Sequence, residues 1–233
     1  MIRKGHLKNT NEAGENMGTS GTLSGFLGVV ILPDKRLMDA AARLTKNEVD
    51  HRVAYRVRPR GVHITLYQAR DFKELPIEIA VKLVKKLNES LVSNRAGELL
   101  LYFLDIRPCV DNDQFLLWNV DRTKENQRLV AAHGMSLALS AWVEPQLVNE
   151  ARLKSRVTAM PDKRKWRERK LYANARVFGS THVGEDYQPH ITLAAKAEGF
   201  GEFKPRQEAQ LGSAARVALA RIGEWGKIDE ILL

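Results

Sequence analysis

The chain has 233 residues, 44% of them hydrophobic and 28% charged, which is typical of a soluble globular protein with room for a sizeable core. No apolar run approaches the roughly 20 residues of a membrane span, and residues 1–24 lack the apolar segment of a signal peptide. The net charge of +9, with a pI near 9.7, favours an anionic partner such as RNA, DNA or a nucleotide, although a solvated basic surface is a common alternative.

The start of the chain predicts a tail, a strand and a helix. Residues 1–24 are rich in Gly, Asn, Thr and Ser and have no apolar periodicity, so we expect a mobile tail. Gly25–Leu32 is an almost continuous apolar run, which predicts a buried strand that ends at Pro33. Asp34 can then cap a helix that extends to about Glu48.

Two strands and a helix are expected next. Residues 51–58 alternate between apolar and Arg side chains, and Pro59–Gly61 turns the chain into a strand at 62–69. Leu75-Pro76 opens a predicted helix that reaches about Asn94, because Pro is favoured at an early helical position. The expected buried stripe of this helix is Ile79, Leu83, Leu87 and Leu91.

The middle of the chain predicts paired strands at 97–106 and 114–120, followed by a helix at about 123–143. Cys109 lies at the end of the first of these strands. As the only cysteine, it excludes an internal disulfide, argues against a cysteine-type zinc site and suits a reducing cytoplasm. The side chains expected to face inward from the helix are Leu129, Ala132, Met135, Leu139 and Val143.

A basic segment lies between residues 144 and 180. The stretch Arg152–Lys170 holds nine Lys or Arg residues against two acidic ones, and aromatic Trp166 and Tyr172 lie within or beside it. Such a segment can hold a single-stranded nucleic acid and stack a base. A solvated, partly helical insertion is an equally good interpretation.

The last part of the chain predicts a strand at 190–196 and a terminal hairpin built from 214–222 and 227–232. Strands separated by amphipathic helices predict an α+β protein with two lobes around a cleft. A doubly wound parallel sheet is disfavoured, because the chain has no Gly-rich turn from strand to helix. We expect one domain at 25–233 that carries the basic insertion at about 144–180.

One tetrapeptide occurs twice, as His63-Ile64-Thr65-Leu66 and as His190-Ile191-Thr192-Leu193. Because side chains alternate along a strand, His63 and Thr65 are expected on one face, with the Ile and Leu on the other. The second copy repeats this pattern. In each copy the apolar pair can enter a core while the imidazole and the hydroxyl face a cleft.

Two such His-x-Thr strands resemble the motifs of the 2H phosphoesterase superfamily, which includes enzymes similar to 2′-5′ RNA ligases and cyclic phosphodiesterases. The closing segment, residues 217–228, also looks like the last hairpin of that family. The resemblance implies a bilobal, pseudo-twofold α+β fold, with antiparallel sheets lining a central cleft and helices outside. It also implies metal-independent chemistry on cyclic phosphates or 2′-5′ phosphodiesters. The motif histidines are 127 positions apart, which is long for compact members of the family.

The chemistry of phosphodiester cleavage explains why these residue types are needed. One imidazole can remove a proton from the nucleophile while the other supplies one to the leaving oxygen, since His titrates near neutral pH. The hydroxyls of Thr65 and Thr192 can donate to the phosphoryl oxygens. For a 2′,3′-cyclic phosphate we expect His190 as the base and His63 as the acid, although the sequence does not fix this order.

Candidate substrate-binding residues flank the motifs. By strict alternation Tyr67 continues the face of His63, and Lys196 follows Ala194 on the equivalent face of the second strand. Tyr67 is expected to stack on a base or ribose, with packing as the alternative, and Lys196 to meet a flanking phosphate. Further candidates for substrate contacts are Arg58, Arg60 and Tyr187.

The leading hypothesis is therefore a phosphodiesterase for RNA 2′,3′-cyclic phosphates or 2′-5′ bonds. The alternatives are a hydrolase of cyclic oligonucleotide signals and a non-catalytic RNA-binding module. The expected partner is RNA or a small phosphorylated nucleotide, with no membrane, no metal and no cofactor, and the protein is expected to be a monomer. No role is assigned to His6, His51, His133 or His182.

Overall fold

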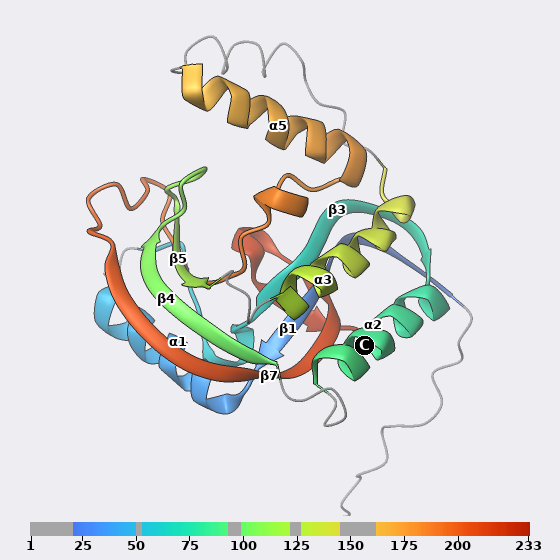
Figure 1. The fold of residues 1–233 in the computed structure, drawn as a ribbon, viewed down its shortest axis with the longest axis horizontal. Helices are drawn as coiled ribbons and strands as arrows, with labels where there is room; N and C mark the ends of the chain where they lie inside the picture. The colour runs from blue at the N-terminus through green and yellow to red at the C-terminus, as the bar shows by residue number, and fades with distance from the viewer. Residues whose placement is uncertain (1–20, 50–52, 93–98, 122–126, 145–161) are drawn as a thin grey trace, which may run out of the picture.

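The computed structural model describes residues 21–49, 53–92, 99–121, 127–144 and 162–233 (Figure 1). Most of the expected tail and the first half of the basic segment lie outside this part of the chain. The strands are β1 (Thr22–Pro33), β2 (Tyr55–Arg56), β3 (Ile64–Pro76), β4 (Leu100–Pro108), β5 (Phe115–Val120), β6 (His190–Ala195), β7 (Arg206–Ile222) and β8 (Ile228–Ile231). The helices are α1 (Lys35–Glu48), α2 (Ile77–Leu91), α3 (Gln127–Ser136) and α5 (Asp162–Phe178), with 3-10 segments η1 (Pro59–Gly61), η3 (Leu137–Trp142), η4 (Gly184–Asp186) and η5 (Glu224–Gly226).

The strands form one eight-stranded sheet in the order β2-β6-β5-β4-β7-β1-β3, with β8 beside β7. Every strand pairing within it is antiparallel, so the α+β class is confirmed. Strand β7 is long and curved (Figure 1). Its first half pairs with β4 and its second half pairs with β1, so this one strand joins the two parts of the sheet.

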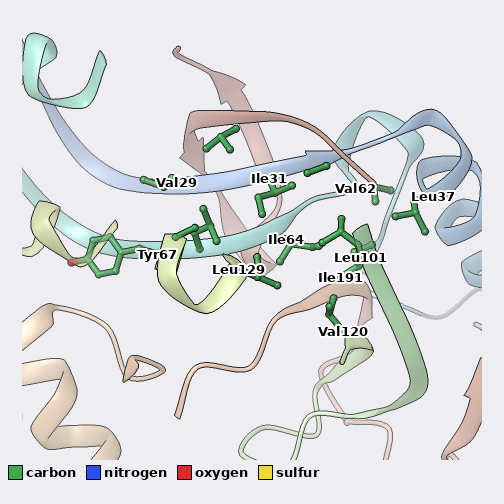
Figure 2. Packing of buried hydrophobic residues seen from close by; sticks show 14 of the residues in the cluster. Val29, Ile31, Leu37, Val62, Ile64, Tyr67, Leu101, Val120, Leu129 and Ile191 are labelled. Carbon is green, nitrogen blue, oxygen red and sulfur yellow. The ribbon is translucent and has the colours of Figure 1, made fainter. Parts of the chain in front are cut away.

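A hydrophobic core extends across both parts of the sheet. Leu27, Val29 and Ile31 alternate along β1 into the main cluster, while Val30 faces a smaller one with Ala218 and Ala220. Both faces of β1 are therefore covered, which explains its almost continuous apolar sequence. Ile64 and Ile191, the second residues of the two tetrapeptides, are completely buried in the main cluster (Figure 2). The two motifs thus share one core.

The N-terminus of α1 is fixed to β7 by one side chain. Asp34 Oδ1 accepts a hydrogen bond from the Leu37 amide at 2.8 Å, which makes Asp34 the predicted N-cap. Its Oδ2 accepts from the Ser213 amide at 2.7 Å. Gly212 permits this close approach, because a Cβ there would lie 2.2 Å from Leu37.

Several predicted elements differ from the structure in extent. Strand β1 begins at Thr22, inside the segment expected to be a tail, and β2 covers only two residues of the strand expected at 51–58. Strand β3 continues to Pro76, far beyond the expected end at residue 69. The helix expected at 123–143 is α3 followed by the 3-10 segment η3.

The buried stripe of α2 also differs from the predicted one. Ile79 is 36% exposed, whereas Ala80 and Val84 are buried together with Leu87 and Leu91. The inward face of α2 is therefore centred on the line through Ala80, Val84, Leu87 and Leu91, and the helix is rotated about its axis relative to the prediction. Among the described residues, no helix is long and apolar enough to cross a membrane.

Candidate functional site

Two connections bring the tetrapeptides together in space. Strand β2 pairs with β6, and the Val57 amide then donates to the carbonyl of Leu193 at 2.9 Å, so this segment runs along the second motif before it enters the first. From the other side, the Tyr187 hydroxyl donates to the carbonyl of Thr65 at 3.1 Å. Motifs that are 127 positions apart in sequence are therefore neighbours in the fold.

The two motif histidines are held in the same way. His63 Nδ1 lies 2.7 Å from the carbonyl of Gly61, and His190 Nδ1 lies 2.7 Å from the carbonyl of Gln188. A carbonyl only accepts, so in both rings Nδ1 carries the hydrogen. Nε2 is consequently the nitrogen that can accept a proton when the ring is neutral, or donate one when the ring is charged.

The environment keeps both imidazoles neutral near pH 7. The pKa of His190 is lowered to about 4, chiefly because burial disfavours the imidazolium, and the nearby His182 and His63 lower it as well. Burial also lowers the pKa of His63, an effect that the hydrogen bond to Gly61 opposes. The influence of His63 on His190 is further evidence that the two rings lie close together.

Each motif strand has a one-residue register shift at its fourth position. Between β1 and β3, Val30 pairs with Thr65 and Val29 with Tyr67, so Leu66 is extra. Between β5 and β6, Leu117 pairs with Thr192 and Leu116 with Ala194, so Leu193 is extra. These are β-bulges, which are common beside active sites because they redirect the side chains that follow.

The bulges correct the predicted alternation. Up to the fourth position it holds for the apolar residues, since Ile64, Leu66, Ile191 and Leu193 are in the core, and Thr65, Thr192 and His190 are partly exposed as expected. His63 differs from His190 in that it is buried, with 7% of its surface exposed. Beyond it the alternation is wrong: Tyr67 and Ala194 both join the core cluster instead of continuing the histidine face.

Tyr67 is therefore placed as a packing residue. Its side chain is 2% exposed, its ring meets Phe72 edge-on, and its hydroxyl donates to the carbonyl of Phe178 at 2.5 Å. The packing alternative accounts for this placement, and the ring has no exposed face on which a base could stack. Tyr187, another predicted substrate contact, is only 4% exposed, and its hydroxyl donates to the carbonyl of Thr65.

The carbonyl of each extra residue receives a hydrogen bond from outside the regular strand pairing. For Leu193 the donor is Val57, and for Leu66 it is Nδ1 of His133 at 2.6 Å. His133 also accepts at Nε2 from the Gly184 amide at 3.0 Å, so its ring is neutral with the hydrogen on Nδ1. Its ring stacks on Tyr187 at 3.9 Å.

Through these hydrogen bonds, His133 and Tyr187 connect the first motif to the segment that precedes the second motif. The sequence did not assign a role to His133. The only signal that could have found it is a buried polar residue on the inward face of a helix, beside Leu129 and Ala132.

The remaining predicted contacts lie at the surface or near it. Arg58 and Arg60 are exposed on the turn before the first motif. Lys196 is partly buried and pairs with Glu198 at 3.5 Å.

Helix α5 contributes part of the basic segment, and two of its cations have partners within the protein. Arg167 forms a two-pronged ion pair with Asp111 at 2.6 and 2.8 Å, and Lys170 binds Asp186 at 3.1 Å. His182 lies 3.1 Å from the same Asp111 carboxylate. These interactions attach α5 to the β4–β5 turn and to the segment before the second motif, and α5 lies outside the sheet (Figure 1).

Within the described ranges, no group of three or more His, Cys, Asp or Glu side chains is arranged to hold a metal ion. The arrangement that the structure does provide is a pair of neutral imidazoles with matched orientation and a threonine beside each. Such a pair can transfer one proton in each direction.

Several solved structures resemble this chain, and two of them follow. The protein TT0787 of Thermus thermophilus superposes with a TM-score of 0.57 at 14% sequence identity, over 89% of this chain and 95% of that chain. A structure described as a phosphoesterase superposes with a TM-score of 0.49 at 12% identity, over 91% of this chain and 97% of that chain. No protein-family model and no curated protein matches the sequence. The chain therefore shares its overall fold with TT0787 over most of its length.

Proposed function

We propose that the protein is a metal-independent phosphodiesterase that acts on RNA 2′,3′-cyclic phosphates or 2′-5′ bonds by paired-histidine catalysis. The observation that carries the proposal is the matched pair of histidines. Both Nδ1 atoms are fixed by the carbonyl two residues earlier, and both Nε2 atoms belong to neighbouring motifs that share a core. The matched hydrogen bonds and matched bulges also support a pseudo-twofold relation between two lobes of a 2H phosphoesterase-like fold.

The proposed reaction divides the two proton transfers between the rings. His190, whose pKa is lowered further by two neighbouring histidines, starts neutral and takes a proton from water. The water oxygen bonds to phosphorus, the bond from phosphorus to one of the two ribose oxygens of the cyclic phosphate breaks, and His63 gives its proton to that oxygen. The substrate phosphate favours the charged form of His63, because an opposite charge nearby raises the pKa of an imidazole.

The threonines complete the proposed site. Thr65 and Thr192 each lie two positions after a motif histidine and are partly exposed, unlike the Ile and Leu around them. Their hydroxyls would donate to the non-bridging oxygens, where negative charge is held in the transition state.

The test is a substrate panel assayed with EDTA present. It contains an RNA with a 2′,3′-cyclic phosphate, a 2′-5′ dinucleotide and a cyclic dinucleotide. We expect turnover of one of the first two, and a loss of about 10²–10⁴-fold in kcat for either His63→Gln or His190→Gln. The double variant should lose little more than the worse single variant, because the two groups act as a unit.

Urea unfolding of each variant shows whether it still folds. Binding without turnover would replace the proposal with a non-catalytic RNA-binding module, and turnover of the cyclic dinucleotide alone would replace it with a signal hydrolase. Wild-type kcat in both folded single variants would exclude paired catalysis.

A further inference from the structure

A cationic cavity lies beside the first motif. Its volume is about 560 Å³, within the range of small-molecule sites. Two segments line it: the β2–η1 segment and the start of β8 with the residue before it. The lining residues that matter for its chemistry are Tyr55, Arg56, Arg58, Arg60, Gly61 and Lys227.

The lining carries positive charge and no carboxylate. Arg58 and Arg60 are exposed and form no ion pair with another residue in the described part of the chain. Lys227 pairs with Asp229 at 3.2 Å but stays about half exposed. Arginines that line one cavity suit a phosphate, because the guanidinium group can donate two parallel hydrogen bonds to its oxygens.

Gly61 connects this cavity with the motif histidine. It lines the cavity, and its carbonyl accepts the hydrogen bond that orients His63. Gly61 and His63 are two residues apart, and two residues of chain span at most about 7 Å, so the cavity begins next to the first motif.

The cations of α5 and those of the cavity differ in whether they already have an acidic partner, and this difference indicates which of them would bind an additional substrate phosphate. On α5, Arg167 and Lys170 are already bound to Asp111 and Asp186. Arg58 and Arg60 have no comparable carboxylate among the described residues. Arg58 and Arg60 can therefore bind a phosphate without first losing an acidic partner, whereas Arg167 and Lys170 cannot.

We infer that this cavity binds a second phosphate of the substrate, next to the one that is cleaved. The inference deepens the proposed function and rests on it. It places the contacts with this second phosphate at Arg58, Arg60 and Lys227 rather than on α5. The ligand class is a nucleotide that carries a cyclic phosphate together with a 5′-phosphate.

The first experiment compares adenosine 2′,3′-cyclic phosphate with its 5′-phosphorylated form. We expect the wild type to favour the phosphorylated form by about 10–100-fold in kcat/KM, as charge-assisted hydrogen bonds allow. In Arg58→Gln/Arg60→Gln the ratio of the two kcat/KM values should fall toward one. Lys227→Gln, in the other segment that lines the cavity, should shift the ratio in the same direction.

Arg70→Gln is the matched control. Arg70 is an exposed arginine on β3 whose guanidinium lies over the ring of Phe26, outside the cavity. This variant should keep the wild-type ratio. An unchanged ratio in the double variant, or an equal fall in the control, would overturn the inference.

A second measurement separates the cavity from the catalytic proposal. Calorimetric titration with inorganic pyrophosphate should give a Kd at least about tenfold weaker in Arg58→Gln/Arg60→Gln than in the wild type or Arg70→Gln. Equal affinities would reject the cavity as a phosphate site even if the enzyme is active. Selective loss of pyrophosphate binding without turnover of any substrate would reject the proposed function and leave the cavity as a phosphate site.

Discussion

At the scale of single residues, the site depends on which nitrogen of each histidine is free. Both Nδ1 atoms are bound to carbonyls at 2.7 Å, so both rings present Nε2. The residue types and their shared faces were predictable from the duplicated tetrapeptide, because strand alternation separates His and Thr from Ile and Leu. The orientation of the rings was not predictable, since it depends on the turns Gly61–His63 and Gln188–His190.

The lowered histidine pKa values predict an acidic pH optimum for kcat/KM, which reports the free enzyme. Below about pH 4, His190 is protonated and cannot act as a base. Above the pKa of His63, which lies under its ordinary value of 6.5, the acid is lost. We therefore expect kcat/KM to fall as the pH rises above 6.5.

The profile of kcat should peak at a higher pH than that of kcat/KM, because the bound phosphate raises the pKa of His63. Initial rates measured between pH 3.5 and 9, a range of about five to six units around the ordinary pKa of histidine, would give both profiles. A kcat/KM that keeps rising above pH 7 would contradict the assignment of roles.

At the scale of elements, the β-bulges decide which residues line the site. Leu66 and Leu193 are each one residue more than the partner strand has, so Tyr67 and Ala194 enter the core. The difference in size between Tyr67 and Ala194 therefore concerns the packing of the core. A sequence pattern with a period of two does not reveal a bulge, because the shift arises from pairing with another strand.

His133 should stabilise the fold, because its ring donates a hydrogen bond to the carbonyl of Leu66, the extra residue of the bulge in β3. His133→Leu removes the donor to the carbonyl of the buried Leu66 and the acceptor of the amide of Gly184, a residue that is exposed. The buried carbonyl of Leu66 loses this partner, which costs about 1–3 kcal/mol, so the free energy of unfolding should fall by about 1–3 kcal/mol. Urea denaturation measures this change.

His133→Gln serves as the matched variant, because its amide can both donate and accept. It should recover part of the lost stability. A fall of less than about 0.5 kcal/mol for His133→Leu, the range of an ordinary surface substitution, would show that the two hydrogen bonds are unimportant.

At the scale of the whole molecule, α5 is attached through charges and one helix end. Arg167 binds Asp111, Lys170 binds Asp186, and the carbonyl of Phe178 receives the hydroxyl of Tyr67. Gly179, with φ of +66°, ends the helix in the left-handed conformation that glycine tolerates. The basic composition of this segment thus includes cations that hold the fold together.

Loss of the Asp111 carboxylate should loosen α5. For Asp111→Asn we expect amide hydrogen exchange in α5 to speed up by about tenfold, because the two-pronged ion pair with Arg167 is lost. Arg169→Gln, an exposed position on the same helix, is the control and should leave exchange unchanged. Equal protection of α5 in Asp111→Asn and the wild type would refute this role.

The same ion pair should have a defined dependence on pH. The hydrogen bond from Arg167 lowers the pKa of Asp111 below its ordinary value, and His182 acts in the same direction. The stabilisation is therefore present above the unfolded pKa of about 3.9 and is lost as the pH falls through the folded value. In the wild type, α5 should stay protected at pH 5.

The sequence by itself determined the α+β class, most of the helices and strands, the cap at Asp34 and the two strands that carry His and Thr. These follow from local periodicity and capping, which neighbouring residues fix. The tertiary structure decided which face of α2 is buried, where the strands bulge, that Tyr67 and Tyr187 pack inside, and that His133 supports the first motif. It also paired Arg167 and Lys170 with carboxylates and left Arg58 and Arg60 around a cavity. Each of these features depends on contacts between residues far apart in the chain, and a local pattern carries no information about such contacts.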